Sequence, residues 1–241
     1  MFHLQEVFYR KEAHHMSTIA IVGAGPGLGM AIAREFGRHH FTVALVSRNR
    51  TKLDGYVQEL AAEGITAEAF PADVLDHAAL RAALGEADRR FGGIDVLEYS
   101  PVDAGETTPA PPSTVRSADV EAQLQSQFLG AIAAAQAVLP GMQERGSGTL
   151  LFTTGAGSVN PVPFFSAANA AGAALRNWVH NLHNELDGTG VYAAHVPIAA
   201  MIDIVVPGHP TASAADIAAT YWRLHTDRNV AERMYTAIDT E

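Results

Sequence analysis

The chain of 241 residues contains no cysteine and only two lysines, Lys11 and Lys52, beside 14 arginines. The absence of cysteine excludes disulfide scaffolds, thiolate metal sites and cysteine nucleophiles. Since no uncharged apolar run approaches the roughly 18 residues of a membrane span, we expect no membrane partner. A formal net charge of −10 argues against a nucleic-acid partner, because phosphate binding needs a basic surface.

Length and composition indicate one domain with its own core. Apolar residues make up 48% of the chain and charged residues 17%, which is typical of a globular protein. Residues 1–16 lack the continuous apolar segment of a secretory signal, and a second methionine, Met16, ends them. We therefore interpret residues 1–16 as an extension and residues 17–241 as the domain, with a cytoplasmic location as the simplest expectation.

Short apolar runs alternate with helical patterns from Ser17 onward. The expected strands are 18–22, 42–47, 66–70, 94–99, 149–153 and 192–196. The expected helices run from the glycine-rich turn to about residue 36 and over 51–63, 77–91, 117–139, 165–186 and 216–225, with Pro140-Gly141 ending the fourth of them. This alternation predicts an α/β fold: a single doubly wound, Rossmann-type parallel sheet with helices on both faces. The proline-rich stretch 100–116 and the irregular stretch 198–212 are expected to form lid segments over one edge.

A glycine-rich turn follows the first expected strand and opens the first expected helix. It reads Gly23-Ala24-Gly25-Pro26-Gly27-Leu28-Gly29. Glycines in this context allow a tight turn and a close approach of the backbone to a pyrophosphate at the helix N-terminus. The turn therefore predicts a dinucleotide site, the alternative being a tight turn that binds nothing.

The residues after the second expected strand bear on which dinucleotide binds. A protein that binds NAD places Asp or Glu there for the ribose 2′-hydroxyl, whereas this chain has Ser47-Arg48-Asn49-Arg50. Guanidinium groups pair with a 2′-phosphate, and a carboxylate would repel it. We therefore expect NADP(H) to be preferred over NAD(H), with Arg48 and Arg50 facing the 2′-phosphate. The alternative is that Arg48 is a solvated loop residue.

In order and spacing, the chain from about Ser17 to His225 resembles the short-chain dehydrogenase/reductase family. Gly23, Gly27 and Gly29 match its G-x-x-x-G-x-G pattern, and Asp73-Val74 match the pair that contacts adenine in the family. The resemblance implies a small-molecule ligand in addition to the cofactor. It also implies a homodimer or homotetramer formed through helices 117–139 and 165–186, where Trp178 is a candidate anchor.

The resemblance breaks down at the catalytic positions. The family's Tyr-x-x-x-Lys corresponds to Phe165 and Asn169, its serine to Thr154 and its helix asparagine to Gln127. A phenyl ring has no exchangeable proton, so Phe165 cannot act as a general acid or base. Asn169 can still bond a ribose hydroxyl of the cofactor, but it brings no positive charge. We therefore expect an atypical active site.

Other groups can be considered for the missing proton chemistry. Tyr99 ends the fourth expected strand and has a hydroxyl, although it could instead pack beneath the cofactor. Thr154 keeps a hydroxyl where the family has serine. His195 has a suitable residue type, although a hydrogen-bonded structural role is the alternative. Glu98 should face away from Tyr99 by strand periodicity and should need a polar partner.

The remaining patterns concern metals and the ligand. No metal site is predicted, because His180 and His183 lack a third ligand nearby. Four residues are expected to form an apolar floor that suits a partly hydrophobic ligand, namely Pro161, Pro163, Phe164 and Phe165.

Three functions remain open at this point. The first is an oxidoreductase that binds NADP(H) with a non-standard active site. The second is a non-catalytic nucleotide-binding or redox-sensing protein. The third is an enzyme that performs non-redox chemistry in the same fold. Fold analogy favours the first, but whether the protein is an enzyme stays open.

Overall fold

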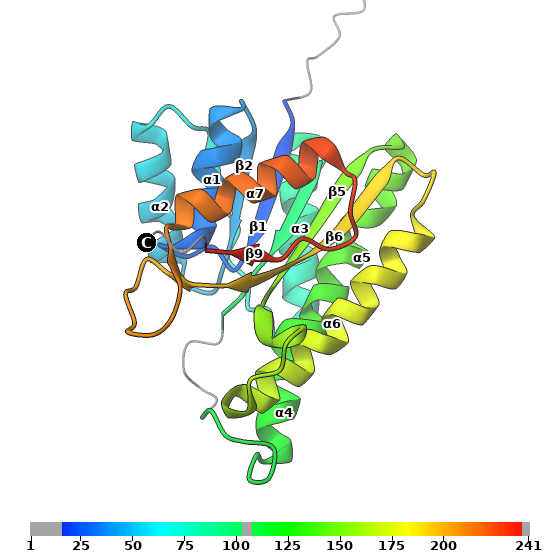
Figure 1. Cartoon of the computed structure of the whole chain (residues 1–241). Helices are drawn as coiled ribbons and strands as arrows, with labels where there is room; N and C mark the ends of the chain where they lie inside the picture. Colours follow the sequence, from blue (N-terminus) through cyan, green and yellow to red (C-terminus); the bar gives the residue numbers. More distant parts are fainter. Residues whose placement is uncertain (1–15, 103–107, 238–241) are drawn as a thin grey trace, which may run out of the picture.

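Two layers of helices enclose a parallel sheet in the computed structural model, which describes residues 16–102 and 108–237 (Figure 1). Residues 1–15 of the predicted extension and residues 103–107 of the first predicted lid segment lie outside the described residues. Within the described ranges, no helix combines the length and the apolar character that crossing a membrane requires.

The sheet contains seven strands in the order β3-β2-β1-β4-β5-β6-β9, and every neighbouring pair is parallel. Their bounds are β1 Thr18–Val22, β2 Thr42–Val46, β3 Ala67–Ala69, β4 Val96–Tyr99, β5 Gly148–Gly155, β6 Val191–Ala199 and β9 Tyr235–Thr236. A separate short pair joins β7 (Met201–Ile202) to β8 (Thr211–Ala212). This order confirms the predicted doubly wound, Rossmann-type sheet.

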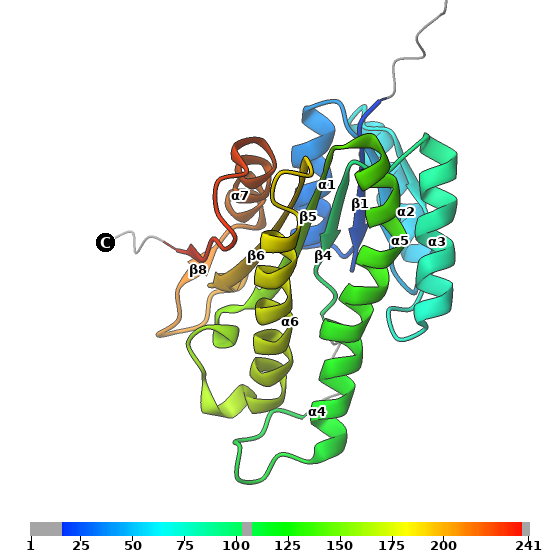
Figure 2. The same ribbon diagram turned by 90° about the vertical axis from the view of Figure 1, so that its right-hand side faces the viewer.

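The helices lie between the strands of the sequence, as the alternation predicted. They are α1 Leu28–Arg38, α2 Arg50–Ala62, α3 His77–Phe91, α4 Ser117–Gln123, α5 Gly130–Arg145, α6 Ser166–Glu185 and α7 Ala214–Asp227. A π-helical segment, Leu124–Leu129, joins α4 to α5, and short 3₁₀ turns occupy Ala156–Ser158 and Pro163–Phe165. Helices α1, α2 and α7 cover one face of the sheet, and α3, α5 and α6 cover the other (Figures 1 and 2).

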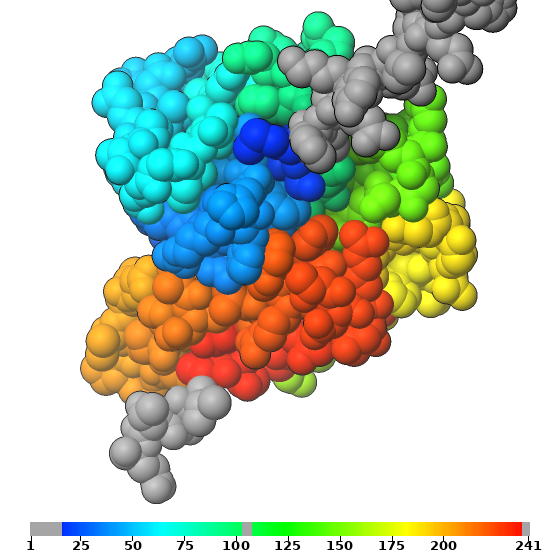
Figure 3. All heavy atoms as spheres, turned by 90° about the horizontal axis from the view of Figure 1, so that it is seen from above, coloured from blue at the N-terminus to red at the C-terminus, as the bar shows by residue number. Residues whose placement is uncertain are grey.

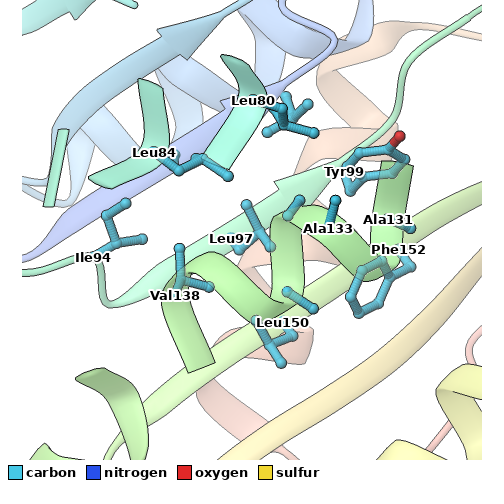
Figure 4. Close-up of a cluster of buried hydrophobic side chains, with 14 of the residues drawn as sticks. Leu80, Leu84, Ile94, Leu97, Tyr99, Ala131, Ala133, Val138, Leu150 and Phe152 are labelled. Carbon is cyan, nitrogen blue, oxygen red and sulfur yellow. The ribbon is translucent and has the colours of Figure 1, made fainter. Parts of the chain in front are cut away.

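The central strands are apolar on both sides because each side faces a helical layer. All five residues of β1 are buried; Ile19 and Ile21 enter one core cluster, and Ala20 and Val22 enter the other. The cluster beneath α3 and α5 is shown in Figure 4, where side chains from the helices meet those of β4 and β5. The two-sided core explains why these strands read as continuous apolar runs rather than as alternating ones.

The prediction that Pro140-Gly141 ends a helix is wrong, because α5 continues to Arg145. Proline removes one backbone donor, and the carbonyl left without its partner is that of Gln136, four residues earlier. Gln136 is exposed, so water can satisfy this carbonyl. Met142, two residues after Pro140, is fully buried and holds the last turns against the core. The helix ends at Gly146, which has a φ of 64°.

Two further expectations need correction. Trp178 packs edge-on against Phe152, with the ring centroids 5.5 Å apart, so its ring is largely committed to the protein's own core. Strand β6 extends beyond the predicted residue 196 to Ala199, because Ile198 and Ala199 pair with β9. The sequence did not indicate β9, which has only two residues.

The segment that follows α7 returns to the sheet. Ala231 and Arg233 bond the backbone of His195 on either side, which places Glu232 beside that histidine. Seen from above, α7 and the C-terminal segment cross the molecule as a band next to α1 (Figure 3). The end of the described chain thereby covers the β6 edge of the sheet.

Glu98 is fully buried in β4 and has polar partners, as expected. One carboxyl oxygen lies 2.9 Å from the Ser100 hydroxyl, and the other lies 2.9 Å from the Thr153 hydroxyl. Burial raises the pKa of Glu98 to about 8, against the opposite effect of these two hydrogen bonds. Glu98 therefore carries a proton at neutral pH in the folded protein.

A Glu98→Gln variant should show a weaker loss of stability as pH rises. The folded pKa of Glu98 is raised, so the native protein loses its contribution between pH ~4.5 and ~8, with a slope on the order of 1 kcal/mol per pH unit. Glutamine cannot ionise, and the variant should gain relative to native protein across this window. Urea denaturation at pH 5 and pH 8 measures the difference. Glu144→Gln, an exposed change on α5, is the control. An unchanged pH dependence in Glu98→Gln would contradict the buried, protonated state.

Candidate functional site

A cavity of about 1140 Å³ lies at the carboxyl ends of the central strands. Ligands of doubly wound sheets bind at this edge. The lining includes all but one of the residues predicted for the cofactor, namely Gly23, Gly25, Gly27, Leu28, Gly29, Ser47, Arg48, Asn49, Asp73 and Val74. Three separate loops of the sequence therefore meet in one cavity, as the spacing predicted.

The glycine loop leaves room where a phosphate would approach. No described atom lies within 4 Å of the position that a Cβ would take at Gly27, and at Gly25 the nearest is 3.8 Å away. Helix α1 begins directly after this loop with no side chain capping its N-terminus. Backbone N–H groups and the helix dipole at such an end attract anions. The described residues thus fit the pyrophosphate of a dinucleotide.

At Gly23, the backbone conformation and a close contact exclude any larger residue. Its φ is 99°, and a Cβ there would lie 2.6 Å from the backbone nitrogen of Pro101. The first turn therefore packs directly against the loop that follows β4.

The two arginines after β2 are placed differently. Arg48 lines the cavity, whereas the guanidinium of Arg50 bonds the carboxylate of Asp54 at 2.7 Å on the first turns of α2. The expectation that Arg50 also faces the cofactor is therefore wrong, because its i,i+4 partner holds it on the helix. Asn49 accepts a bond from the Lys52 N–H at 3.0 Å and caps α2.

Lys52 and Tyr56 also line the cavity, and the sequence analysis missed both. Their four-residue spacing puts them on one face of α2. Arg48 precedes Lys52 by the same spacing and lines the same cavity. This spacing is the signal that could have found them. Lys52 adds a second positive charge near Arg48.

Asp73 and Val74 reach the cavity from the loop after β3. The carboxylate of Asp73 accepts a hydrogen bond from the Leu75 N–H at 3.0 Å. This local bond stabilises a turn that presents the two residues to the cavity.

The residues at the expected catalytic positions are only partly brought together. Phe165 lines the cavity with its side chain about half exposed, and Gln127 lines it from the π-helical segment. Asn169 instead donates to the Val162 carbonyl at 2.7 Å and packs closely against Gly157. Asn169 lies outside the described lining, so its predicted contact with the cofactor is not supported. The side-chain amide of Asn169 is held by the Val162 carbonyl, in the segment that precedes α6.

Tyr99 lies in the core among Leu97, Ala131 and Phe152 (Figure 4). Its hydroxyl donates to the Ser126 carbonyl in the π-helical segment. Burial raises the pKa of Tyr99 well above the usual value. The geometry supports the packing alternative rather than a catalytic role.

Thr154 lines the cavity and bonds inward. Its hydroxyl lies 2.8 Å from the Ser158 hydroxyl and 2.8 Å from Nε2 of His195. Nδ1 of His195 lies 2.9 Å from the carboxylate of Glu232. His195 is completely buried and hydrogen-bonded at both ring nitrogens. The sequence could indicate Thr154 and His195 separately, but it did not indicate Glu232.

The predicted apolar floor is wrong except at Phe165. Pro161, Pro163 and Phe164 are exposed and lie outside the described lining. Their segment runs along the outside of the site before α6 begins, because Asn169 and the 3₁₀ turn hold it there.

Both predicted lid segments do contribute to the described lining. The first supplies Ser100, Pro101, Val102, Thr108, Pro109 and Ala110, and the second supplies Ile198, Ala200 and Ile202. Part of the cavity wall is therefore apolar, and these two segments contribute to it, whereas of the predicted floor only Phe165 does.

The strand order and the glycine loop beside this cavity define a protein of the Rossmann type. A family model described as short chain dehydrogenase matches residues 17–202. The chain belongs to this family of oxidoreductases. It is 29% identical over 235 residues to a fatty acyl-CoA reductase of Mycobacterium tuberculosis, covering 92% of this chain and 78% of the relative.

Solved structures share the fold at lower identity. The L-sorbose reductase of Gluconobacter frateurii, complexed with NADPH and L-sorbose, has a TM-score of 0.81 at 19% identity, over 92% of this chain and 96% of that one. A 7α-hydroxysteroid dehydrogenase complexed with NADH has a TM-score of 0.83 at 21% identity, over 92% and 93%. One of these proteins is complexed with NADPH and the other with NADH, so the fold by itself does not choose between the two cofactors.

Proposed function

We propose that the protein is an NADP(H)-dependent oxidoreductase of hydroxyl or carbonyl compounds with a non-standard active site. The observation that carries this proposal is one cavity that joins the glycine loop, Arg48 and the Thr154 hydroxyl. A bound nicotinamide cofactor supplies or accepts the hydride. The residues of this chain bind the cofactor, orient the ligand and handle the proton.

The ligand is proposed to be partly hydrophobic. Val102, Ile198 and Ile202 line the cavity together with the ring of Phe165. The similarity to a protein named a fatty acyl-CoA reductase points the same way. Apolar walls with few polar groups suit such a ligand.

The strongest alternative is a protein that binds the nucleotide without catalysing a reaction. Phe165 at the cavity favours this alternative, because a phenyl ring cannot move a proton. The same cofactor would bind in either case, so binding is measured before turnover.

NADPH should bind more tightly than NADH, because Arg48 and Lys52 line the part of the cavity proposed for the 2′-phosphate. Losing one charge-assisted contact costs about 1.5–3 kcal/mol, or roughly 10- to 100-fold in Kd. Arg48→Asp should reverse the preference in calorimetric titrations. Arg50→Asp makes the same charge change outside the described lining and should keep it. Equal affinities of native protein for both cofactors would refute the proposed preference.

Native protein should turn over generic ketones and alcohols slowly. A Phe165→Tyr, Asn169→Lys double variant should raise carbonyl reduction, because a tyrosine gains its proton role when a nearby cation lowers its pKa. Each single variant should do less. Phe164→Tyr adds the same hydroxyl outside the described lining and is the control. NADPH consumption over a ketone panel is the measurement. Rapid native turnover that the double variant does not raise would contradict the proposed replacement of the dyad.

We also propose a homodimer or homotetramer formed through α4, α5 and α6. The exposed side of α6 carries small residues, Ala170 and Ala173, which allow close helix packing. Ala173→Arg should therefore lower the mass that light scattering measures at micromolar concentration. Ala82→Arg, on the exposed side of α3, should leave the mass unchanged. A monomeric native protein would contradict the assembly.

A further inference from the structure

A buried chain of hydrogen bonds leads from the cavity to the C-terminal segment. It begins at the Thr154 hydroxyl in the cavity wall, passes through both ring nitrogens of His195 and ends at the carboxylate of Glu232. Residues from β5, β6 and the segment after α7 form it. Of the three, Glu232 is the residue that no motif in the sequence indicated.

Two side chains of α6, those of Arg176 and His180, hold Glu232 in place. Arg176 donates to its two carboxylate oxygens at 2.5 and 3.1 Å, and Nε2 of His180 lies 3.2 Å from Oε2. Burial alone would raise the pKa of Glu232, but the hydrogen bonds from Arg176, His195 and His180 outweigh it and lower the pKa to about 2. His180 counts as a cation only when it is protonated. Glu232 is therefore a carboxylate at neutral pH.

The charge of Glu232 fixes the proton on His195. A carboxylate only accepts hydrogen bonds, so Nδ1 of His195 must donate to it. Nε2 is then left without a proton when the ring is neutral, and at 2.8 Å it is a nearer acceptor for the Thr154 hydroxyl than the Gly155 carbonyl at 3.1 Å. This is the order of donors and acceptors found in Ser-His-Asp triads.

His195 is neutral at pH 7, which leaves one of its ring nitrogens free to accept a hydrogen bond. Burial lowers its pKa to about 4, although Glu232 acts in the opposite direction; Arg176 and His180, the other charged groups that face it, lower it further. The ring is neutral above this pKa and has an open acceptor at Nε2. The carboxylate would stabilise the imidazolium that forms when a proton arrives.

We propose that Thr154, His195 and Glu232 form a proton relay that removes the hydroxyl proton of an alcohol bound beside Thr154. This inference rests on the proposed oxidoreductase function and names the groups that move its proton. Thr154 touches the substrate and is the catalytic residue. His195 and Glu232 act through Thr154 as positioning residues.

The relay moves one proton and no electrons. As the alcohol is oxidised, its hydride with two electrons goes to the cofactor, and its O–H proton passes to Oγ1 of Thr154. The proton of Thr154 passes at the same time to Nε2 of His195. After the carbonyl product leaves, the proton returns through Thr154 to water in the cavity. Carbonyl reduction runs the same transfers in reverse.

A second threonine–histidine pair, formed by the buried Thr149 and the half-buried His225, serves as a control. The Thr149 hydroxyl lies 3.0 Å from Nδ1 of His225, and burial lowers the pKa of His225 to about 4. This pair lies at the amino-terminal end of β5, opposite the cavity. It has the same residue types, although His225 is half-buried where His195 is fully buried, and neither Thr149 nor His225 lines the described cavity.

Turnover is measured with NADP⁺ and a panel of secondary alcohols. Thr154→Val and His195→Gln should each lower kcat by about 10²-fold or more, which is the usual value of general base catalysis. Glu232→Gln should give an intermediate loss and move the acid limb of the pH profile to lower pH, since Glu232 raises the pKa of His195. His225→Gln should leave kcat within about twofold of native.

Nitrogen NMR on histidine-labelled native protein tests the relay without turnover. The His195 resonances, assigned by their loss in His195→Gln, should show the proton on Nδ1 at pH 7. Thr154→Val should shift the Nε2 resonance, because the bond that it accepts is removed. A proton on Nε2 in native protein would overturn the relay.

The Phe165→Tyr, Asn169→Lys double variant also distinguishes a role of His195 in proton transfer from a purely structural one. In the Phe165→Tyr, Asn169→Lys background, a tyrosine takes over the proton, so adding His195→Gln should cost much less than it does in native protein. An equal loss in both backgrounds would indicate a structural role for His195 and would overturn the relay.

The outcomes separate the two proposals. If native protein binds no NADP(H), the proposed function is refuted and the relay fails with it. If the cofactor binds, then native protein without alcohol turnover, or turnover that Thr154→Val leaves unchanged, overturns the relay alone.

Discussion

The parallel pairing of β5 with β6 is the constraint on which the described site depends. In this register Phe152 lies opposite His195, and Thr154 lies opposite Pro197. Side chains two residues apart share one face of a sheet, so Thr154 and His195 project side by side toward α6. A slip of one strand by one residue would turn its side chain to the other face and separate the two. The register thereby fixes a hydroxyl at the cavity wall and an imidazole behind it.

The local part of this architecture could be predicted from the sequence. Each strand is buried on both faces and reads as an apolar run, and the glycine loop and Asp73-Val74 follow their strands directly. Position along the chain therefore placed them at the same edge. The predicted helix end at Pro140 was wrong because helix propensity considers proline alone. It does not take into account that the Gln136 carbonyl, which loses its donor, lies at an exposed residue, or that Met142 is buried in the core.

The non-local part could not be predicted in this way. Arg48 and Arg50 look alike in sequence, and only the ion pair with Asp54 separates them. Asn169 was assigned a cofactor contact by analogy, but its amide donates to the Val162 carbonyl and the residue lies outside the described lining. Glu232 belongs to a short segment without periodicity, and its position follows from backbone pairing with His195. Glu232 and His195 lie 37 residues apart, and no local pattern encodes their contact, whereas the i,i+4 spacing of Arg50 and Asp54 is a local pattern that the sequence analysis did not use.

The part of the site proposed for the cofactor and the part proposed for catalysis depend on different interactions. Side chains in one part can therefore change while the other part stays the same. The half proposed for the cofactor consists of the glycine loop, the start of α1 and the cations of Arg48 and Lys52, and none of these groups requires a particular side chain at position 165. The catalytic half depends on single protons, so replacing one hydroxyl removes its chemistry. A buried histidine between Thr154 and an anchored carboxylate can restore a proton path without moving the backbone. The described structure thus keeps the glycine loop and sheet of its family, while its proton transfer is proposed to use Thr154, His195 and Glu232.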